Sequence, residues 1–378
     1  MKAQGSQHNR IYGLDILRAF AILFVLYSHA FFLIMDHVNE RVYNLLSLDG
    51  VTLFFVLSGF LIGGILIRTI ENKGFGFKEL LNFWTRRWFR TLPNYFLMLI
   101  VLVLIALVTG KETGSLARYF FFLQNFSGPH PAFFPEAWSL TVEEWFYLLI
   151  PAGLFLSLII TGKHKSTTIL AWITAILFLV TAYRTYRAVT LDIPDFDSWD
   201  QLQRKIVLTR LDSIMYGFLG AWMAFYRPVY WFKYRKLLFI AGILLLLTPV
   251  VFEFFMGKVL IFLNYFSLPL TSLATLLMLP MLSVIRTGKG KISKFLTFVS
   301  MISYSMYLVN FSLVQLTIVP ALTPIIIKIT TNHLIISLIR VSCYWGFTFI
   351  LSYLMYRFYE NPMMNLRDKI KWTPKRVK

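Results

Sequence analysis

Side chains that can carry out acid–base chemistry lie inside long apolar segments of this sequence. One apolar segment contains Arg18 and His29, another begins with Glu143 and Glu144, and a third contains Arg340. A charged side chain at the centre of a membrane costs about 3 kcal/mol even on the mildest insertion scale. We therefore expect these groups to line a polar cavity or to pair with one another.

The spacing of these residues indicates a catalytic base and its partner. On a helix, Arg18 and His29 are separated by three turns plus about 20°, so they share one face with about 16 Å between their backbones. Glu143 lies near the start of a segment that we expect to run in the opposite direction. We predict that it lies at the depth of His29, where a carboxylate can orient an imidazole base.

Each of these residues also has a purely structural interpretation. The Arg18 side chain can extend from a helix end to the membrane interface. His29 can form a hydrogen bond between two packed helices. Glu143 can be a negative charge favoured by the dipole at a helix N-terminus.

A second cluster consists of Arg86, Arg87 and Arg90. Arg86 and Arg90 are neighbours on a helix, and three adjacent cations repel one another unless an anion lies among them. The planar guanidinium group is well suited to phosphate. The cluster therefore predicts binding of a phosphate-bearing cofactor or a lipid headgroup, and the alternative is a basic anchor on the cytoplasmic side of the membrane.

The elements that must position these residues are membrane-spanning helices. The chain has 378 residues, of which 57% are hydrophobic and only 15% charged, so a soluble fold cannot bury its apolar surface. We expect an all-α, polytopic bundle of about ten spans of roughly 20 residues each. These are residues 14–34, 50–67, 91–109, 138–160, 167–183, 211–226, 237–256, 259–285, 297–319 and 335–357.

The basic residues are distributed unequally between the two sets of loops. With a cytoplasmic N-terminus, the inner segments hold 25 Lys and Arg and the outer segments hold 10. Positive charge collects on the cytoplasmic side of membrane proteins, so both termini are predicted to be cytoplasmic. The net charge of +19 then needs no nucleic acid as a partner. The single cysteine, Cys343, excludes an intramolecular disulfide.

Other motifs add little. The outer loop 192–200 combines carboxylates with aromatic side chains, a composition that suits either a sugar-binding surface or a solvated acidic loop. The sequence contains no glycine-rich phosphate loop, no metal-ligand spacing and no nucleophile elbow. We therefore expect no metal cofactor.

Taken in order, several motifs resemble the membrane acyltransferase 3 family over residues 13 to about 362. They are Gly13 to Ile22 with His29, Phe54 to Ile62, Arg86 to Arg90, Trp138 to Tyr147, Arg210 to Asp212, Ile302 to Leu308, and Glu360 to Pro362. The family often has a histidine two residues after the Tyr-Leu of its ninth-span motif, and this chain has Asn310 there. We assign Asn310 no acid–base role.

The resemblance implies a multi-pass enzyme of the bacterial cytoplasmic membrane. It would transfer an acyl group, usually acetyl, from cytoplasmic acyl-CoA to a hydroxyl of a cell-surface saccharide or related acceptor. It implies that His29 is catalytic and Arg18 essential, and that Arg86, Arg87 and Arg90 bind the donor. Some members carry a fused extracytoplasmic domain, whereas here we expect a cytoplasmic segment 1–13, one membrane domain 14–357 and a basic tail 358–378.

The hypothesis that joins these observations is acyl transfer with His29 as general base. Glu143 orients the His29 ring, and Arg18 stabilises negative charge on the donor or in the transition state. Covalent acylation of His29 is a variant that remains open. The alternatives are a proton-coupled secondary transporter that uses Arg18, His29 and Glu143, and a lipid-binding assembly protein.

Overall fold

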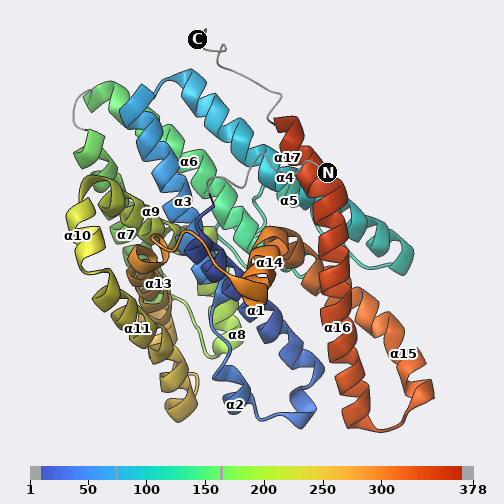
Figure 1. Cartoon of the computed structure of the whole chain (residues 1–378). Helices are drawn as coiled ribbons and strands as arrows, with labels where there is room; N and C mark the ends of the chain where they lie inside the picture. Colours follow the sequence, from blue (N-terminus) through green and yellow to red (C-terminus); the bar gives the residue numbers. More distant parts are fainter. Residues whose placement is uncertain (1–9, 74, 162–164, 368–378) are drawn as a thin grey trace.

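A computed structural model describes residues 10–73, 75–161 and 165–367 of the chain, and the regular structure within these residues is entirely helical (Figure 1). The N-terminal residues 1–9 and most of the expected basic tail, from residue 368, lie outside the described residues. The long helices are α1 (Tyr12–Ala30), α3 (Gly50–Lys73), α4 (Phe77–Thr109), α6 (Ala137–Thr161), α7 (Lys165–Thr190), α9 (Leu211–Tyr226), α11 (Arg235–Met256), α13 (Leu268–Leu282), α14 (Gly290–Val309) and α16 (His333–Met355).

Short helices connect or extend the long ones. They are η2 (Phe31–Leu33), η3 (Met35–His37), α2 (Glu40–Asn44), α5 (Leu116–Phe120), α8 (Phe196–Trp199), η4 (Asp200–Arg204), η5 (Val207–Thr209), α10 (Pro228–Lys233), α12 (Leu260–Phe262), η6 (Leu263–Ser267), η7 (Asn310–Ile318), α15 (Val319–Ile329), η8 (Tyr356–Glu360) and α17 (Asn361–Arg367). Four of them, η4, η6, η7 and η8, are π-helical.

Nine helical segments within the described residues are long and apolar enough to cross a membrane. They confirm nine of the ten expected spans and define a multi-pass integral membrane protein. The tenth expected span is α9, which has 16 residues. At 1.5 Å per residue it is about 24 Å long, shorter than a hydrocarbon core of about 30 Å. Helix α9 packs against α3, α7 and α13 rather than standing at the periphery.

Two glycines allow α3 and α9 to approach each other closely. A Cβ atom on Gly59 of α3 would collide with the backbone carbonyl of Ile214, and one on Gly217 of α9 would collide with that of Val56. Small residues at such crossings are typical of membrane helices, because packing replaces the hydrophobic driving force that lipid does not supply. This contact holds α9 inside the bundle.

Polar contacts join loops that the charge distribution predicts on the same side of the membrane. Lys258 Nζ donates to Glu40 Oε1 at 2.8 Å, which links two predicted outer segments. At the opposite end, Glu71 accepts a hydrogen bond from Tyr226 at 2.6 Å and lies 3.6 Å from Lys165 Nζ. These contacts agree with the predicted sorting of the loops into two faces. That the face with Glu71 is cytoplasmic stays a prediction.

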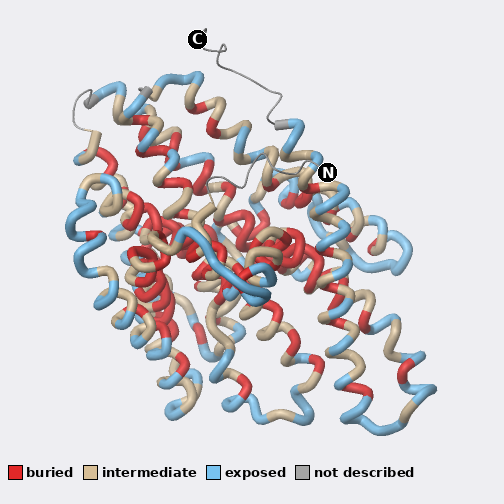
Figure 2. Tube along the Cα trace, viewed as in Figure 1, coloured by how far each residue is buried: buried red, intermediate tan, exposed pale blue. Residues whose placement is uncertain are grey.

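The buried residues concentrate in the middle of the bundle, and the outer surfaces of the peripheral helices are exposed (Figure 2). The exposed surfaces are rich in large apolar side chains, as expected of helices in contact with lipid. The buried centre also contains many serine, threonine and charged side chains. It is this polar interior that positions the candidate site.

Candidate active site

His29, at the end of α1, forms a short hydrogen bond with Asn310, the first residue of η7. The His29 Nδ1 and Asn310 Oδ1 atoms are 2.6 Å apart. The imidazole ring also lies 4.4 Å from the Phe311 ring, centroid to centroid. The backbone carbonyl of His29 accepts a hydrogen bond from Gln315 of the same segment. The π-helical segment η7 therefore surrounds the histidine on several sides.

The surroundings of Asn310 determine which nitrogen of His29 carries the proton. Asn310 Nδ2 donates to the carbonyls of Met306 at 2.9 Å and Tyr307 at 2.7 Å, so Oδ1 is the atom that faces the imidazole. Tyr344 donates a further hydrogen bond to Oδ1 at 3.3 Å. An amide oxygen only accepts. His29 Nδ1 is therefore the donor, and Nε2 keeps the lone pair that a general base needs.

The predicted pairing of Glu143 with His29 is wrong. Glu143 accepts hydrogen bonds from Ser58 at 2.8 Å and from Tyr147 at 3.0 Å, and Asn310 occupies the position expected for it. The segment 121–136 before α6 contains both exposed and buried side chains, and Glu136 and Ala137 at the start of the helix are buried.

The carboxylate that shares a cavity with His29 is Glu136, which sequence analysis missed. It lies directly before α6 and two helical turns from Glu143 on the same face. Its Oε2 is 2.5 Å from Ser312 Oγ, and its Oε1 accepts from the Ser312 backbone nitrogen at 3.2 Å. Burial raises the pKa of Glu136 to about 7, although the Ser312 hydroxyl opposes that shift. The seven-residue spacing from Glu143 was the signal available in the sequence.

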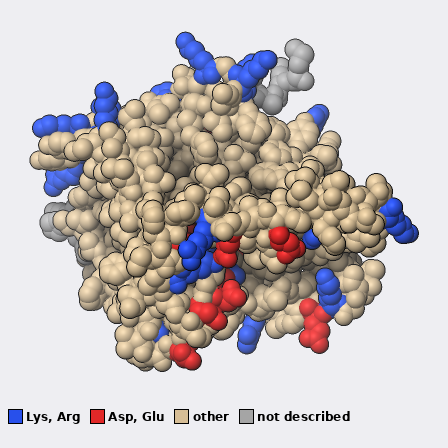
Figure 3. Space-filling model, turned by 90° about the horizontal axis from the view of Figure 1, so that it is seen from below, with Lys and Arg blue, Asp and Glu red and all other residues tan. Residues whose placement is uncertain are grey.

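His29 and Glu136 both line a cavity of about 480 Å³. Several residues of the loop 192–200 also line it, namely Phe196, Asp197, Trp199 and Asp200. Viewed from below, acidic and basic side chains gather in the middle of this face of the molecule (Figure 3). The loop 192–200 thus forms part of the wall of the cavity that His29 lines.

The charges at the mouth of this cavity are paired. Arg204 lies 2.8 Å from Asp200 and 3.3 Å from Asp49, and its guanidinium carbon lies 5.1 Å from the centre of the Trp138 ring. Burial alone would raise the pKa of Asp49, but the charges of Arg204 and Arg210 lower it to about 2. Paired charges and aromatic rings form a polar surface without a large unbalanced charge, which suits a neutral hydroxyl-bearing molecule.

The predicted donor residues lie towards the opposite end of the bundle. Arg18 and Arg90 are part-buried and close enough to interact electrostatically with each other and with Glu143. Among the described residues, neither guanidinium donates a hydrogen bond or forms an ion pair. Arg86 is exposed, and the Arg87 guanidinium carbon lies 6.0 Å from the centre of the Phe83 ring. Arg18 and Arg90 are therefore two neighbouring cations that a bound anion would satisfy.

Two further charged residues of the motifs, Arg210 and Asp212, make buried contacts between helices. Arg184 and Asp212 form a buried ion pair at 2.7 Å between α7 and α9. Arg210 is fully buried, donates to Thr52 at 2.6 Å and lies over the Phe55 ring. These contacts tie α3, α7 and α9 together beside the cavity. They involve no atom of His29.

The described helices thus form a polytopic membrane bundle, and its cavity is lined by an imidazole that Asn310 holds in place. The acyltransferase domain family matches residues 11–357, and the chain therefore belongs to that family and carries its acyltransferase domain. This agrees with the resemblance drawn from the sequence motifs.

Two curated relatives indicate the range of the family. A peptidoglycan O-acetyltransferase of Listeria monocytogenes is 28% identical over 342 residues, which cover 83% of this chain and 51% of that protein. Nodulation protein 10 of Rhizobium leguminosarum is 29% identical over 251 residues, which cover 57% of this chain and 65% of that protein. The chain thus spans about half the length of the first relative. No solved structure matches it.

Proposed function

We propose that this protein transfers an acyl group, in particular acetyl, from acyl-CoA to a hydroxyl of a cell-envelope saccharide. The observation that carries the proposal is the hydrogen bond between His29 Nδ1 and Asn310 Oδ1, which leaves the Nε2 atom free as a base in a residue that lines the cavity. The similarity to a peptidoglycan O-acetyltransferase supports a glycan as the acceptor.

The donor binds from the side of Arg18 and Arg90, which we assign to the cytoplasm. CoA carries phosphates that cannot enter hydrocarbon, and arginine is the side chain best suited to hold them. Arg86 and Arg87 extend this basic surface along α4. The pantetheine arm then carries the thioester through the polar interior towards His29. About 16 Å of helix separates Arg18 from His29, a distance that an extended pantetheine arm can span.

In the chemical step, His29 Nε2 takes the proton of the acceptor hydroxyl while the hydroxyl oxygen attacks the thioester carbonyl carbon. The carbon–sulfur bond then breaks, and the imidazolium returns its proton to the leaving thiolate. The products are the acyl ester and free CoA, and His29 regains its starting state. Arg18 stabilises negative charge on the donor side. Glu143, held by Ser58 and Tyr147, lies near Arg18 and balances its charge.

A reconstituted assay tests this proposal. The full chain in liposomes receives acetyl-CoA labelled in the acetyl group together with extracted envelope glycans, and label in the glycans is counted. His29→Gln should abolish transfer. The matched control is His37→Gln, because His37 is exposed in η3 and does not line the cavity. Equal transfer by wild type and His29→Gln contradicts the proposal.

Donor binding is tested separately, without turnover. CoA should raise the thermal unfolding midpoint of the purified protein, and the double variant Arg18→Ala with Arg90→Ala should weaken its apparent affinity at least tenfold. Arg118→Ala is the control, since Arg118 is exposed on α5 in a predicted outer segment. A transporter that does not use CoA would show no such stabilisation.

A further inference from the structure

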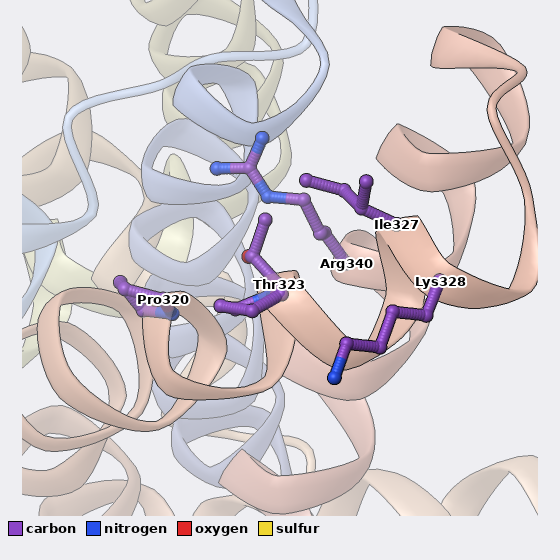
Figure 4. Close-up of a pocket in the computed structure, with 6 residues that line it drawn as sticks. Pro320, Thr323, Ile327, Lys328 and Arg340 are labelled. Carbon is purple, nitrogen blue, oxygen red and sulfur yellow. The ribbon is translucent and has the colours of Figure 1, made fainter.

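A second cavity lies between α15 and α16, away from the candidate active site. It has a volume of about 590 Å³ and is lined by Pro320, Thr323, Pro324, Ile327, Lys328 and Arg340 (Figure 4). Five of these residues belong to α15, and Arg340 belongs to α16. The figure shows Arg340 reaching along the groove above Thr323, with Lys328 nearer its other end. None of these residues lines the cavity that contains His29.

Arg340 lies in the membrane-spanning helix α16, and none of the described residues supplies it with a counter-charge. Its Nε atom is buried and has no hydrogen-bond partner. Among the described residues, its guanidinium forms no ion pair. Residues 254 to 359, which include α14, η7, α15 and α16, contain no aspartate or glutamate. The helices that build this groove therefore cannot neutralise Arg340 themselves.

Apart from the two cations and Thr323, the groove is apolar, and it is open at the surface of the bundle. Pro324 and Ile327 are exposed, and so are the neighbouring Ile325 and Ile329 of α15. The Thr323 hydroxyl is engaged with the carbonyl of Val319. Lys328 is exposed at the second-last position of α15 and adds a second positive charge near the connecting loop.

We propose that this groove binds an anionic phospholipid from the surrounding membrane. The phosphate lies against the Arg340 guanidinium, and Lys328 adds attraction for a net negative headgroup. The acyl chains cover the apolar wall of α15. An anionic phospholipid is the occupant that matches all three features: two cations, no carboxylate on the surrounding helices, and an opening towards lipid.

The position of the groove relates it to the active site. Tyr344 lies one helical turn after Arg340 on the same face of α16. The Tyr344 hydroxyl donates to Asn310 Oδ1 at 3.3 Å and to the Leu26 carbonyl at 3.3 Å. A lipid held at Arg340 thus lies against the helix that supports the partner of His29. Lipid binding itself does not depend on the proposed acyl transfer.

The test measures lipid binding to the purified full chain in a neutral detergent. Native mass spectrometry and thermal unfolding are recorded with dioleoylphosphatidylglycerol, dioleoylphosphatidylcholine, dioleoylglycerol and inorganic phosphate. We expect phosphatidylglycerol to bind most tightly and to raise the unfolding midpoint. Arg340→Gln should weaken its apparent affinity about tenfold, Arg340→Lys should weaken it less, and the control Arg118→Gln should leave it unchanged.

A second variant covers the case in which Arg340→Gln does not fold. Thr323→Trp leaves both cations in place and fills the groove, so it should also reduce phosphatidylglycerol binding. The proposal is overturned if dioleoylglycerol binds as tightly as phosphatidylglycerol, if inorganic phosphate alone gives the full stabilisation, or if the folded groove variants bind phosphatidylglycerol as wild type does.

Discussion

The replacement of Asn310 by alanine tests the orientation of His29 most directly. The change removes the 2.6 Å hydrogen bond to His29 Nδ1 without touching the imidazole. A hydrogen bond of this kind contributes about 1 kcal/mol net, which corresponds to about a fivefold change. Loss of tautomer control adds to it, because a base with its proton on the wrong nitrogen cannot act. We therefore expect kcat to fall by about 10- to 100-fold.

The assay is CoA release from acetyl-CoA by the protein in liposomes supplied with envelope glycans. The KM for acetyl-CoA should stay unchanged, because Arg18 and Arg90 are intact. Asn310→Asp keeps an acceptor oxygen and should retain more activity than Asn310→Ala. Asn264→Ala is the matched control, since Asn264 is a buried asparagine in another π-helical segment and does not line the cavity.

Either of two results would refute the reasoning. If His29→Gln is inactive while Asn310→Ala keeps kcat within twofold of wild type, Asn310 does not position the base. A fall in kcat of the same size in Asn264→Ala would assign the effect to general loosening of the bundle. In either case the tautomer argument fails.

Two further predictions concern stability. Glu136 has a pKa of about 7 in the folded protein, above the usual value of 4.5. Its protonated form therefore stabilises the fold fully below pH 4.5, and this contribution is lost as the pH rises to about 7. The free energy of unfolding changes by about 3 kcal/mol over that range. The unfolding midpoint of Glu136→Gln should therefore fall less than that of wild type between pH 5 and 8, and parallel curves would contradict this. Gly59→Ala should destabilise the α3–α9 contact by about 1 to 3 kcal/mol, measured as a lower unfolding midpoint. The control Gly346→Ala should leave the midpoint unchanged, because Gly346 has open space around it. Equal midpoints for the two variants would refute the argument that α3 and α9 need glycine to approach each other.

Much of the fold followed from local patterns. Nine of the ten predicted spans are helices long and apolar enough to cross a membrane, because about 20 consecutive apolar residues are sufficient to specify such a helix. Helix α9 has the predicted bounds, but its 16 residues are too few to cross the hydrocarbon core, and it packs against α3, α7 and α13. The length of the apolar run 211–226 already showed that this segment is short, but the partners that enclose it could not be read from the run itself.

The candidate site was predicted only in part. The approach of Arg18 to the basic cluster that contains Arg90 could be expected, because both residues lie in apolar or flanking segments at one predicted face. The pairing of Glu143 with His29 failed because counting residues from the ends of two apolar runs does not fix how the two helices are offset along each other. Glu136 was missed for the same reason, since it lies just before the apolar run and was counted as part of a loop.

The sequence alone determined that the chain spans the membrane many times and that Arg18 and His29 share one helix face, because apolar run length and helical periodicity are local properties. Only the tertiary structure decided that His29 is held by Asn310, which is 281 positions away. The relative depth of two helices depends on the packing of side chains between them. No local pattern in either helix records that depth, so the partner of the base emerged only when the helices were assembled.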